Sequence, residues 1–352
     1  MQIREIFSNF VSGNKIPSLR SIETKLSHIA VIIPTLNEER YIDRCLQSVT
    51  EQSYPMELLD ILIVDGGSTD RTHEMVQAWS VRFPNIRWVP NPRRIQSAAF
   101  NIGIEASTAP ISVRMDAHAT YDKDYIRLCE EALQSVPNVG NAGGGIHTVP
   151  TGDSLMARAN AILNRERFGI GGAAFRVGTT AGEVDTVPFG AFHRSVIEQV
   201  GGMREDLERG EDNEYNARLR NAGYKIWFDP RIQCYYYTRP TLALSCKQMY
   251  ANGVSIGELC YKEPSAVSMR HLTPLLFVTS MVVSICIGLF HVAGWWMLSG
   301  ILGTYIVAAL GADMLACKRN GWEYFLVLPL MFLCVHVSYG TGTIVGLIKR
   351  KK

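Results

Sequence analysis

The stretch best equipped for chemistry is a short apolar run that ends in an acid and an imidazole. Residues 111–115 are Ile-Ser-Val-Arg-Met, and Asp116-Ala117-His118 follows them. Side chains two residues apart at a strand end point to the same side, so Asp116 and His118 could hold one divalent cation. This ligand pair suits Mn²⁺ or Mg²⁺ bound together with a phosphate group. An isolated Asp-x-His is more often a solvated strand end, but further acids at Asp65 and Asp212 favour the metal site.

A second candidate is the acidic pair Glu211 and Asp212, which follows Gly210 at the start of a predicted helix. The helix dipole favours acids there, so ordinary capping is one interpretation. The other is a general base, because a hydroxyl that attacks an anomeric carbon must lose a proton to a nearby group. A nucleoside diphosphate leaving group needs a metal rather than a proton. This chemistry therefore differs from the two-carboxylate site of glycoside hydrolysis.

Two segments that follow predicted strands carry polar groups suited to a nucleotide. In residues 34–38 these groups could bind a base or a ribose, although Asn37 alone would more often be a helix cap. In residues 65–70 two glycines allow a close backbone approach, and Asp65 could accept from a uracil N–H or a ribose hydroxyl. The alternative is a capped strand-to-helix turn. The donor-binding candidates in these segments are Pro34, Thr35, Asn37, Glu38, Asp65, Gly66 and Asp70.

Arg94, next to Arg93, and Asn101 lie before and within a predicted helix at residues 95–105. They face the same predicted edge, where a guanidinium would suit the donor diphosphate. A pair of arginines is otherwise a common surface feature.

Arg239, Lys247 and Arg270 lie between the last predicted strand and the first long apolar run. They could hold the diphosphate of a lipid acceptor. Positive charges that flank a membrane helix on its cytoplasmic side explain them equally well.

The elements that must position these groups alternate along the chain. Residues 169–183 are rich in glycine and predict a loop over the site. Strands separated by helices predict an α/β fold, a doubly wound and mostly parallel sheet whose ligands collect at the carboxyl ends of its strands. The predicted strands are residues 28–33, 60–64, 86–89, 111–115, 139–147, 186–192 and 224–228.

Composition excludes several classes of protein. The formal net charge of the 352 residues is +2, which argues against nucleic-acid binding. The eight cysteines show no Cys-x-x-Cys spacing, so a zinc site or disulfide framework is not expected and a reducing compartment is favoured.

The chain becomes mostly apolar after Arg270. Residues 272–290 and 292–312 contain no charged residue, and residues 325–348 contain His336 but no Asp, Glu, Lys or Arg. Each run is close to the ~20 residues that span a bilayer. The polar N-terminal segment predicts no signal peptide. We therefore predict a multi-pass protein of the inner (cytoplasmic) membrane with its catalytic domain in the cytoplasm.

The number of full membrane spans is open, because a third span would place the basic end of the chain outside, against the usual charge bias. Residues 242–262 carry an amphipathic pattern suited to a membrane surface. The predicted organisation is an N-terminal extension (1–27), a catalytic domain (28–240), a membrane-interface segment (241–271), two to three membrane segments (272–348) and a basic tail (349–352).

Together these motifs resemble glycosyltransferase family 2, the inverting nucleotide-sugar transferases. Residues 34–38 and 65–70 are similar to the family's nucleotide motif. Asp116-Ala117-His118 is similar to its Asp-x-Asp metal motif, and Glu211-Asp212 to its base motif. The resemblance implies a GT-A-like domain in which Asp212 is the base and Asp116 contacts both metal and donor.

The chain also resembles bacterial exopolysaccharide glucosyltransferases of the succinoglycan-biosynthesis type. The stretches that carry this resemblance are residues 114–121, 168–176, 185–194, 201–220 and 336–340. It implies transfer of a sugar, with glucose as the candidate, from a UDP-sugar to a polyprenyl-diphosphate-linked glycan at the membrane. Other glycan-assembly enzymes are possible partners.

Two departures from the wider family stand out. His118 replaces the second acid of the metal motif, and no Gln-x-x-Arg-Trp motif of processive synthases follows Asp212, which favours addition of a single sugar. Two alternatives stay open. One is a polyprenyl-phosphate glycosyltransferase, whose ionised acceptor needs no base. The other is a non-catalytic membrane scaffold that binds a nucleotide sugar.

Overall fold

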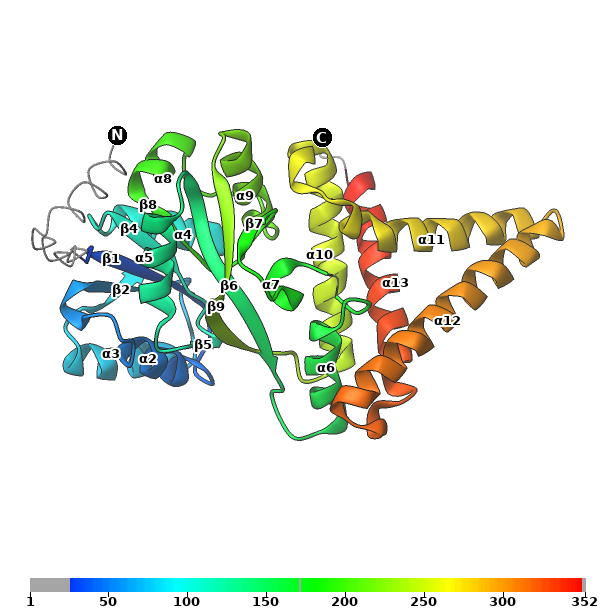
Figure 1. Cartoon of the computed structure of the whole chain (residues 1–352), viewed down its shortest axis with the longest axis horizontal. Helices are drawn as coiled ribbons and strands as arrows, with labels where there is room; N and C mark the ends of the chain where they lie inside the picture. The colour runs from blue at the N-terminus through cyan, green and yellow to red at the C-terminus, as the bar shows by residue number, and fades with distance from the viewer. Residues whose placement is uncertain (1–25, 171, 350–352) are drawn as a thin grey trace, which may run out of the picture.

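The computed structural model describes residues 26–170 and 172–349, which form a nine-stranded sheet with flanking helices and a set of long C-terminal helices (Figure 1). The strand order is β3-β2-β1-β4-β8-β6-β9-β5, with β7 paired to β9. The predicted N-terminal extension before residue 26 and the basic tail after residue 349 lie outside the described residues. The strands are β1 (Ile29–Thr35), β2 (Leu59–Asp65), β3 (Ile86–Pro90), β4 (Ile111–Arg114), β5 (Ala119–Tyr121), β6 (Val139–Val149), β7 (Gly182–Val184), β8 (Gly190–His193) and β9 (Lys225–Tyr237).

The first half of the sheet is parallel, as its buried apolar strands predict. β1 pairs in parallel with β2 and β4, and β2 pairs with β3. Every residue of β1 is buried, since helices cover both faces. The register places Thr35 opposite Asp65, so the ends of β1 and β2 meet at one edge. The chain leaves β4 toward Asp116 at this edge, which confirms the predicted α/β architecture.

The second half of the sheet is mixed. β6 and β9 are parallel, whereas β8 is antiparallel to β4 and β6, and β5 and β7 are antiparallel to β9. The predicted parallel pairing therefore dominates only the N-terminal half. β9 continues to Tyr237, well beyond the predicted strand at 224–228. β5 and β7, at three residues each, are too short for a periodic pattern.

Helices cover both faces of this sheet because alternate residues of β1 enter two separate cores. Ile29, Val31 and Ile33 pack with α2 and α5, and Ala30 and Ile32 pack with α4. The helices of this domain are α2 (Ile42–Thr50), α3 (Thr72–Arg82), α4 (Gln96–Glu105), α5 (Tyr125–Ser135), α6 (Leu155–Arg165), α7 (Ala174–Val177), α8 (Arg194–Val200) and α9 (Glu211–Asn221), with the 3₁₀ turn η1 (Met56–Leu58).

Four long helices follow the sheet, joined in part by η2 (Pro264–Ala266) and η3 (Trp322–Tyr324). They are α10 (Leu242–Lys262), α11 (Met269–Gly288), α12 (Ala293–Asn320) and α13 (Val327–Ile348). The last three are long and apolar enough to cross a membrane. In Figure 1, α11 and α12 project away from the domain as a hairpin, and α10 and α13 lie side by side across its base.

α10 and α13 approach each other closely through glycines. Gly253 and Gly257 of α10 lie against α13, and Gly342 and Gly346 of α13 lie against α10. A Cβ atom at any of these positions would collide with the backbone of the other helix. Two small residues four positions apart on each helix allow this packing, as in membrane helix pairs. The face of α10 predicted to rest on a membrane surface is thus partly covered by α13.

Two ion pairs join the base of the hairpin to the domain that contains the sheet. Arg270, at the start of α11, lies 2.6 Å from Asp185, and Arg319, near the end of α12, lies 2.9 Å from Glu166. The tip of the hairpin, around Phe290, is exposed and lies farthest from the sheet (Figure 1). The start of α11 and the end of α12 therefore both lie next to the sheet domain, opposite the tip of the hairpin.

Candidate active site

The turn after β2 is organised by the carboxylate of Asp65, which is buried at 4% exposure. Its Oδ2 accepts hydrogen bonds from the backbone N–H groups of Gly67 and Ser68, both at 2.8 Å. Gly66 lies against Thr35 and Arg94, where an added Cβ would meet Arg94 Cα at 3.4 Å. The structure thus brings four predicted donor-binding residues to one edge of the sheet.

The neighbouring turns use other predicted donor residues to support one another. Asn37 has a left-handed φ of 56°, and its Oδ1 accepts from Thr69 N at 2.8 Å. Asp70 Oδ1 accepts from Thr72 N at 3.0 Å at the start of α3. Both residues hold the strand-to-helix turns in shape, but neither is an N-cap, because the N-caps of α2 and α3 are Tyr41 and Arg71. Pro34 is a buried residue of β1, paired with Val64.

Asp116 and His118 meet, as their spacing predicts. His118 Nδ1 lies 2.8 Å from Asp116 Oδ1 and 3.2 Å from Glu38 Oε1, and Nε2 lies 3.1 Å from the hydroxyl of Tyr236. Burial alone would lower the pKa of His118, but the Asp116 carboxylate overrides it and raises that pKa well above its ordinary value. Burial alone would raise the pKa of Asp116, and His118 and Arg114 hold it below its ordinary value instead.

Asp116 and His118 offer some, but not all, of the ligands that a divalent cation needs. Asp116 Oδ2 has no hydrogen-bond partner among the described residues, and Asp116 and His118 line the same cavity. No group of three or more metal-ligating side chains occurs within residues 26–170 and 172–349. A cation at Asp116 would therefore complete its coordination mainly with oxygens of the nucleotide and water, as Mg²⁺ and Mn²⁺ do at phosphate sites.

The acidic pair on α9 is held by an arginine that the motif analysis did not assign. Arg114, at the end of β4, has a side chain only 2% exposed. One guanidinium nitrogen contacts Asp212 Oδ1, and the other lies 3.1 Å from Glu211 Oε1. Its Nε has no hydrogen-bond partner among the described residues. The planar guanidinium suits two carboxylates at once, so Arg114 fixes α9 against the sheet edge that carries Asp116.

Asp212 has the properties of a base that works near neutral pH. Burial raises the pKa of Asp212 to about 7, although the positive charge of Arg114 acts in the opposite direction. The neighbouring carboxylates of Glu211 and Asp116 raise it further. Gly210 precedes the helix with a left-handed φ of 78° and lies against Ser255 of α10. The backbone turn at Gly210 thus positions the acids next to the C-terminal helices.

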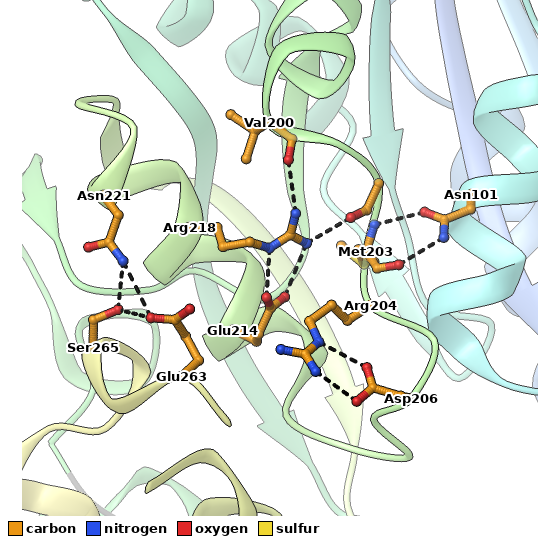
Figure 2. A network of polar contacts seen from close by, with 11 residues as sticks. Asn101, Val200, Met203, Arg204, Asp206, Glu214, Arg218, Asn221, Glu263 and Ser265 are labelled. Carbon is orange, nitrogen blue, oxygen red and sulfur yellow. Dashed lines mark hydrogen bonds and ion pairs between the residues drawn. The ribbon is translucent and has the colours of Figure 1, made fainter. Parts of the chain in front are cut away.

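A polar network around the loop before α9 supports this helix (Figure 2). Glu214 is fully buried and pairs with Arg218 at 2.6 Å, and Arg218 donates to the carbonyls of Val200 and Gly202 at 3.0 and 2.7 Å. Asn101 Nδ2 donates a hydrogen bond to the carbonyl oxygen of Met203, and Asn101 Oδ1 accepts one from Met203 N, both at 2.8 Å. Asn101 also donates to Glu205, so its amide is committed within the protein, and we omit it from the proposed donor site.

One cavity of about 760 Å³ joins these groups to the C-terminal helices. Its polar end includes Asp116, His118 and Asp212, and its other end reaches α11, α12 and α13. Residues 167–170, 172 and 173 and helix α7 also line it, and the segment predicted as a loop at 169–183 contains α7 and β7. The arginines that line the cavity are Arg114, Arg167, Arg176, Arg209, Arg239 and Arg270.

The predicted cationic residues divide between the cavity and the surface. Arg239 is half-buried and lines the cavity, whereas Lys247 is exposed on α10 and is absent from the lining. Lys247 therefore has no place in this cavity. Arg94 is exposed beside Gly66, with φ 58°. An arginine within a buried apolar run was the signal that could have identified Arg114. Tyr236 and Arg176 gave no such signal.

The chain is similar to known glycosyltransferases over most of its length. The family model described as "Glycosyl transferase family 2" matches residues 30–201. A Methanococcus voltae protein, dolichyl N-acetyl-alpha-D-glucosaminyl phosphate 3-beta-D-2,3-diacetamido-2,3-dideoxy-beta-D-glucuronosyltransferase, is 28% identical, covering 92% of this chain and 98% of its own. The succinoglycan biosynthesis protein ExoA of Rhizobium meliloti is 26% identical, covering 89% and 92%.

A solved structure shares the fold. The mannosyltransferase PcManGT from Pyrobaculum calidifontis, in complex with GDP-Man and Mn²⁺, aligns with a TM-score of 0.60 and 21% identity. The alignment covers 94% of this chain and 89% of that protein. This likeness confirms the predicted GT-A-like domain.

Proposed function

Because residues 30–201 form a family 2 glycosyltransferase domain, we propose that this glycosyltransferase moves one sugar from a UDP-sugar to a polyprenyl-diphosphate-linked saccharide. Glucose is the first donor sugar to test, and exopolysaccharide or related surface-glycan synthesis is the proposed setting. The observation that carries the proposal is the cavity that runs from Asp116 and Asp212 to the apolar helices. The relatives' names support a lipid-linked saccharide as acceptor and surface-glycan synthesis as the setting. One name contains a dolichyl phosphate that carries a saccharide, and the other contains succinoglycan biosynthesis. The scaffold alternative is set aside because the chain is an enzyme.

In the proposed reaction Asp212 takes the proton of an acceptor hydroxyl. The hydroxyl oxygen forms a bond to the anomeric carbon of the sugar. The bond from that carbon to the donor diphosphate breaks, and UDP leaves with its electron pair. Attack opposite the leaving group inverts the anomeric configuration. Arg114 Nη1 holds the carboxylate of Asp212 in place, and Glu211 contacts Nη2 of the same guanidinium.

We assign the donor site to the edge formed by Thr35, Glu38, Asp65 and Gly66, with Arg94 beside it. Asp116 and His118 would hold a divalent cation, which would neutralise charge on the departing diphosphate. Binding through His118 requires the imidazole to lose its proton and to release the contact with Asp116. Mn²⁺ is the first ion to test, because the similarly folded mannosyltransferase was solved with it.

We propose that α11 and α12 cross the inner membrane and that α13 lies with α10 at its cytoplasmic surface. Arg270, Lys318 and Arg319 lie at the base of the hairpin, on the side of the catalytic domain. Trp295 and Trp296 lie near the tip, where aromatic residues favour the opposite interface. Both the catalytic domain and Lys349 would then face the cytoplasm, in keeping with the usual charge bias.

This topology predicts opposite accessibility of two introduced cysteines. With a membrane-impermeant maleimide, His291→Cys at the tip should react from the periplasmic side and Lys349→Cys from the cytoplasmic side. Labelling would be compared with that of the parent protein, which has eight cysteines of its own. Reaction of both introduced cysteines from one side would contradict the hairpin with an interfacial α13.

The acceptor class is tested by offering two lipids to the purified enzyme with one UDP-sugar. We expect a new glycosidic product, identified by mass spectrometry, on the polyprenyl-diphosphate saccharide and none on polyprenyl phosphate. The reverse pattern would establish the polyprenyl-phosphate glycosyltransferase instead.

Arg239 lines the cavity that joins Asp116 and Asp212 to the C-terminal helices. Arg239→Gln should raise the KM for the lipid acceptor about tenfold, because a cationic partner of the lipid diphosphate is lost, and should leave the KM for the donor unchanged.

A further inference from the structure

An apolar groove on the hairpin adjoins the active-site cavity. A second cavity of about 570 Å³ lies between α11 and α12, lined by Met297, Gly300, Ile301, Thr304 and Ala308 of α12. Phe277 of α11 and Tyr305 of α12 line both cavities. The groove therefore meets the active-site cavity at two shared aromatic residues.

Phe277 and Tyr305 separate the polar active-site cavity from the apolar groove. The rings of Phe277 and Tyr305 stack with centroids 4.6 Å apart. The Tyr305 hydroxyl lies 2.9 Å from His336 Nδ1, and His336 Nε2 lies 2.9 Å from the carbonyl oxygen of Gly169. One layer of contacts thus links α11, α12 and α13 to the loop over the active site.

Positive charge gathers on the active-site side of this boundary. Arg176 and Arg239 line the cavity and have no carboxylate partner among the described residues, and Arg176 contacts Asn164 Oδ1 at 3.2 Å. Arg270 is paired with Asp185. On the other side the groove offers apolar side chains on helices suited to a bilayer. This order of surfaces matches an amphiphile with an anionic head and a long apolar chain.

We propose that the groove between α11 and α12 binds the first isoprene units of a polyprenyl diphosphate, with the diphosphate among the arginines beyond Phe277 and Tyr305. The inference rests on the proposed function, since it places the chain of the same lipid acceptor. Apolar burial in the groove adds affinity for long-chain acceptors over short ones. The enzyme thereby distinguishes a membrane lipid from a soluble diphosphate.

The test compares binding of two probes to the full-length protein in lipid nanodiscs, a long-chain polyprenyl diphosphate and dimethylallyl diphosphate. A Cβ at Gly300 or Gly303 meets nothing within 4 Å, and only Gly300 of the two lines the groove. Gly300→Trp should fill the groove and weaken long-chain binding about tenfold, because a few buried CH₂ groups are lost. Binding of dimethylallyl diphosphate should stay unchanged, and Gly303→Trp should behave like the parent.

A second pair of variants distinguishes loss of the groove from misfolding of the protein. Thr304→Phe fills the groove one turn further along, whereas Val307→Phe adds the same ring on an exposed position outside it. Equal weakening of both probes by Gly300→Trp, no weakening of either, or equal effects in both members of each pair would overturn the proposal. Because binding is measured without a donor sugar, failure of the transfer reaction is a separate result.

Discussion

Replacing Asp212 by asparagine is expected to lower the turnover of sugar transfer by about 10²- to 10⁴-fold, the range for loss of a positioned general base. The amide keeps the size of the side chain and can still contact Arg114 through its oxygen, so the change removes the proton acceptor with little change of shape. The KM for the UDP-sugar should change little. Initial rates at saturating lipid acceptor measure the effect.

The parent enzyme should also lose activity as the pH falls through about 7. Burial raises the pKa of Asp212 to this value, and a base must be ionised to act. Below the pKa the rate should fall about tenfold per pH unit, because the ionised fraction does. In Asp212→Asn the rate should no longer fall in this way as the pH decreases below about 7.

Glu211→Gln is the matched control, since Glu211 is the other carboxylate that contacts Arg114. It should cost much less activity, because the base remains. The pH limb should persist but move to lower pH, because the charge of Glu211 that raises the pKa of Asp212 is lost. Retention of most activity by Asp212→Asn would remove Asp212 from its assigned role. It would favour an already ionised lipid phosphate as the acceptor.

Replacing Asp116 by alanine is expected to abolish the contribution of a divalent cation to donor binding. A cation on a diphosphate contributes several kcal/mol, which corresponds to about 10²- to 10³-fold in affinity or rate. Calorimetric titration of UDP-sugar with and without Mn²⁺ measures it. The parent should bind more tightly with Mn²⁺, and Asp116→Ala should bind equally weakly in both conditions.

Glu57→Ala serves as the control, because Glu57 is an exposed carboxylate outside the cavity lining. It should preserve the effect of Mn²⁺. If the parent binds UDP-sugar with the same affinity with and without Mn²⁺, the metal role of Asp116 is wrong. The contacts among Asp116, His118 and Glu38 would then serve the donor directly.

Much of the fold could be predicted because each strand of the first half carries its own local signal. The apolar runs now seen as β1, β2 and β4 are buried on both faces, and polar residues follow each of them. Parallel strands end at one edge, so Thr35, Asp65 and Asp116 could be placed together without knowing any contact.

The contacts that complete the site depend on residues far apart in the chain, and no local pattern encodes them. Arg114 and Asp212 are separated by 98 positions, and His118 and Tyr236 by 118. Asn101 appeared suited to a ligand, but its amide binds the loop before α9, whose position depends on the whole domain. The amphipathic pattern of α10 gave no indication that Gly253 and Gly257 pack against α13.

The most direct test of the proposed sugar transfer is UDP release by the detergent-purified enzyme with Mn²⁺, across a panel of UDP- and GDP-sugars. Each donor would be offered with and without a short polyprenyl-diphosphate saccharide. We expect release from one UDP-sugar, and only when the lipid is present, since the role proposed for Asp212 requires an acceptor hydroxyl. Failure of every donor to react with the lipid, while UDP still binds, would contradict the proposed acceptor and the role of Asp212.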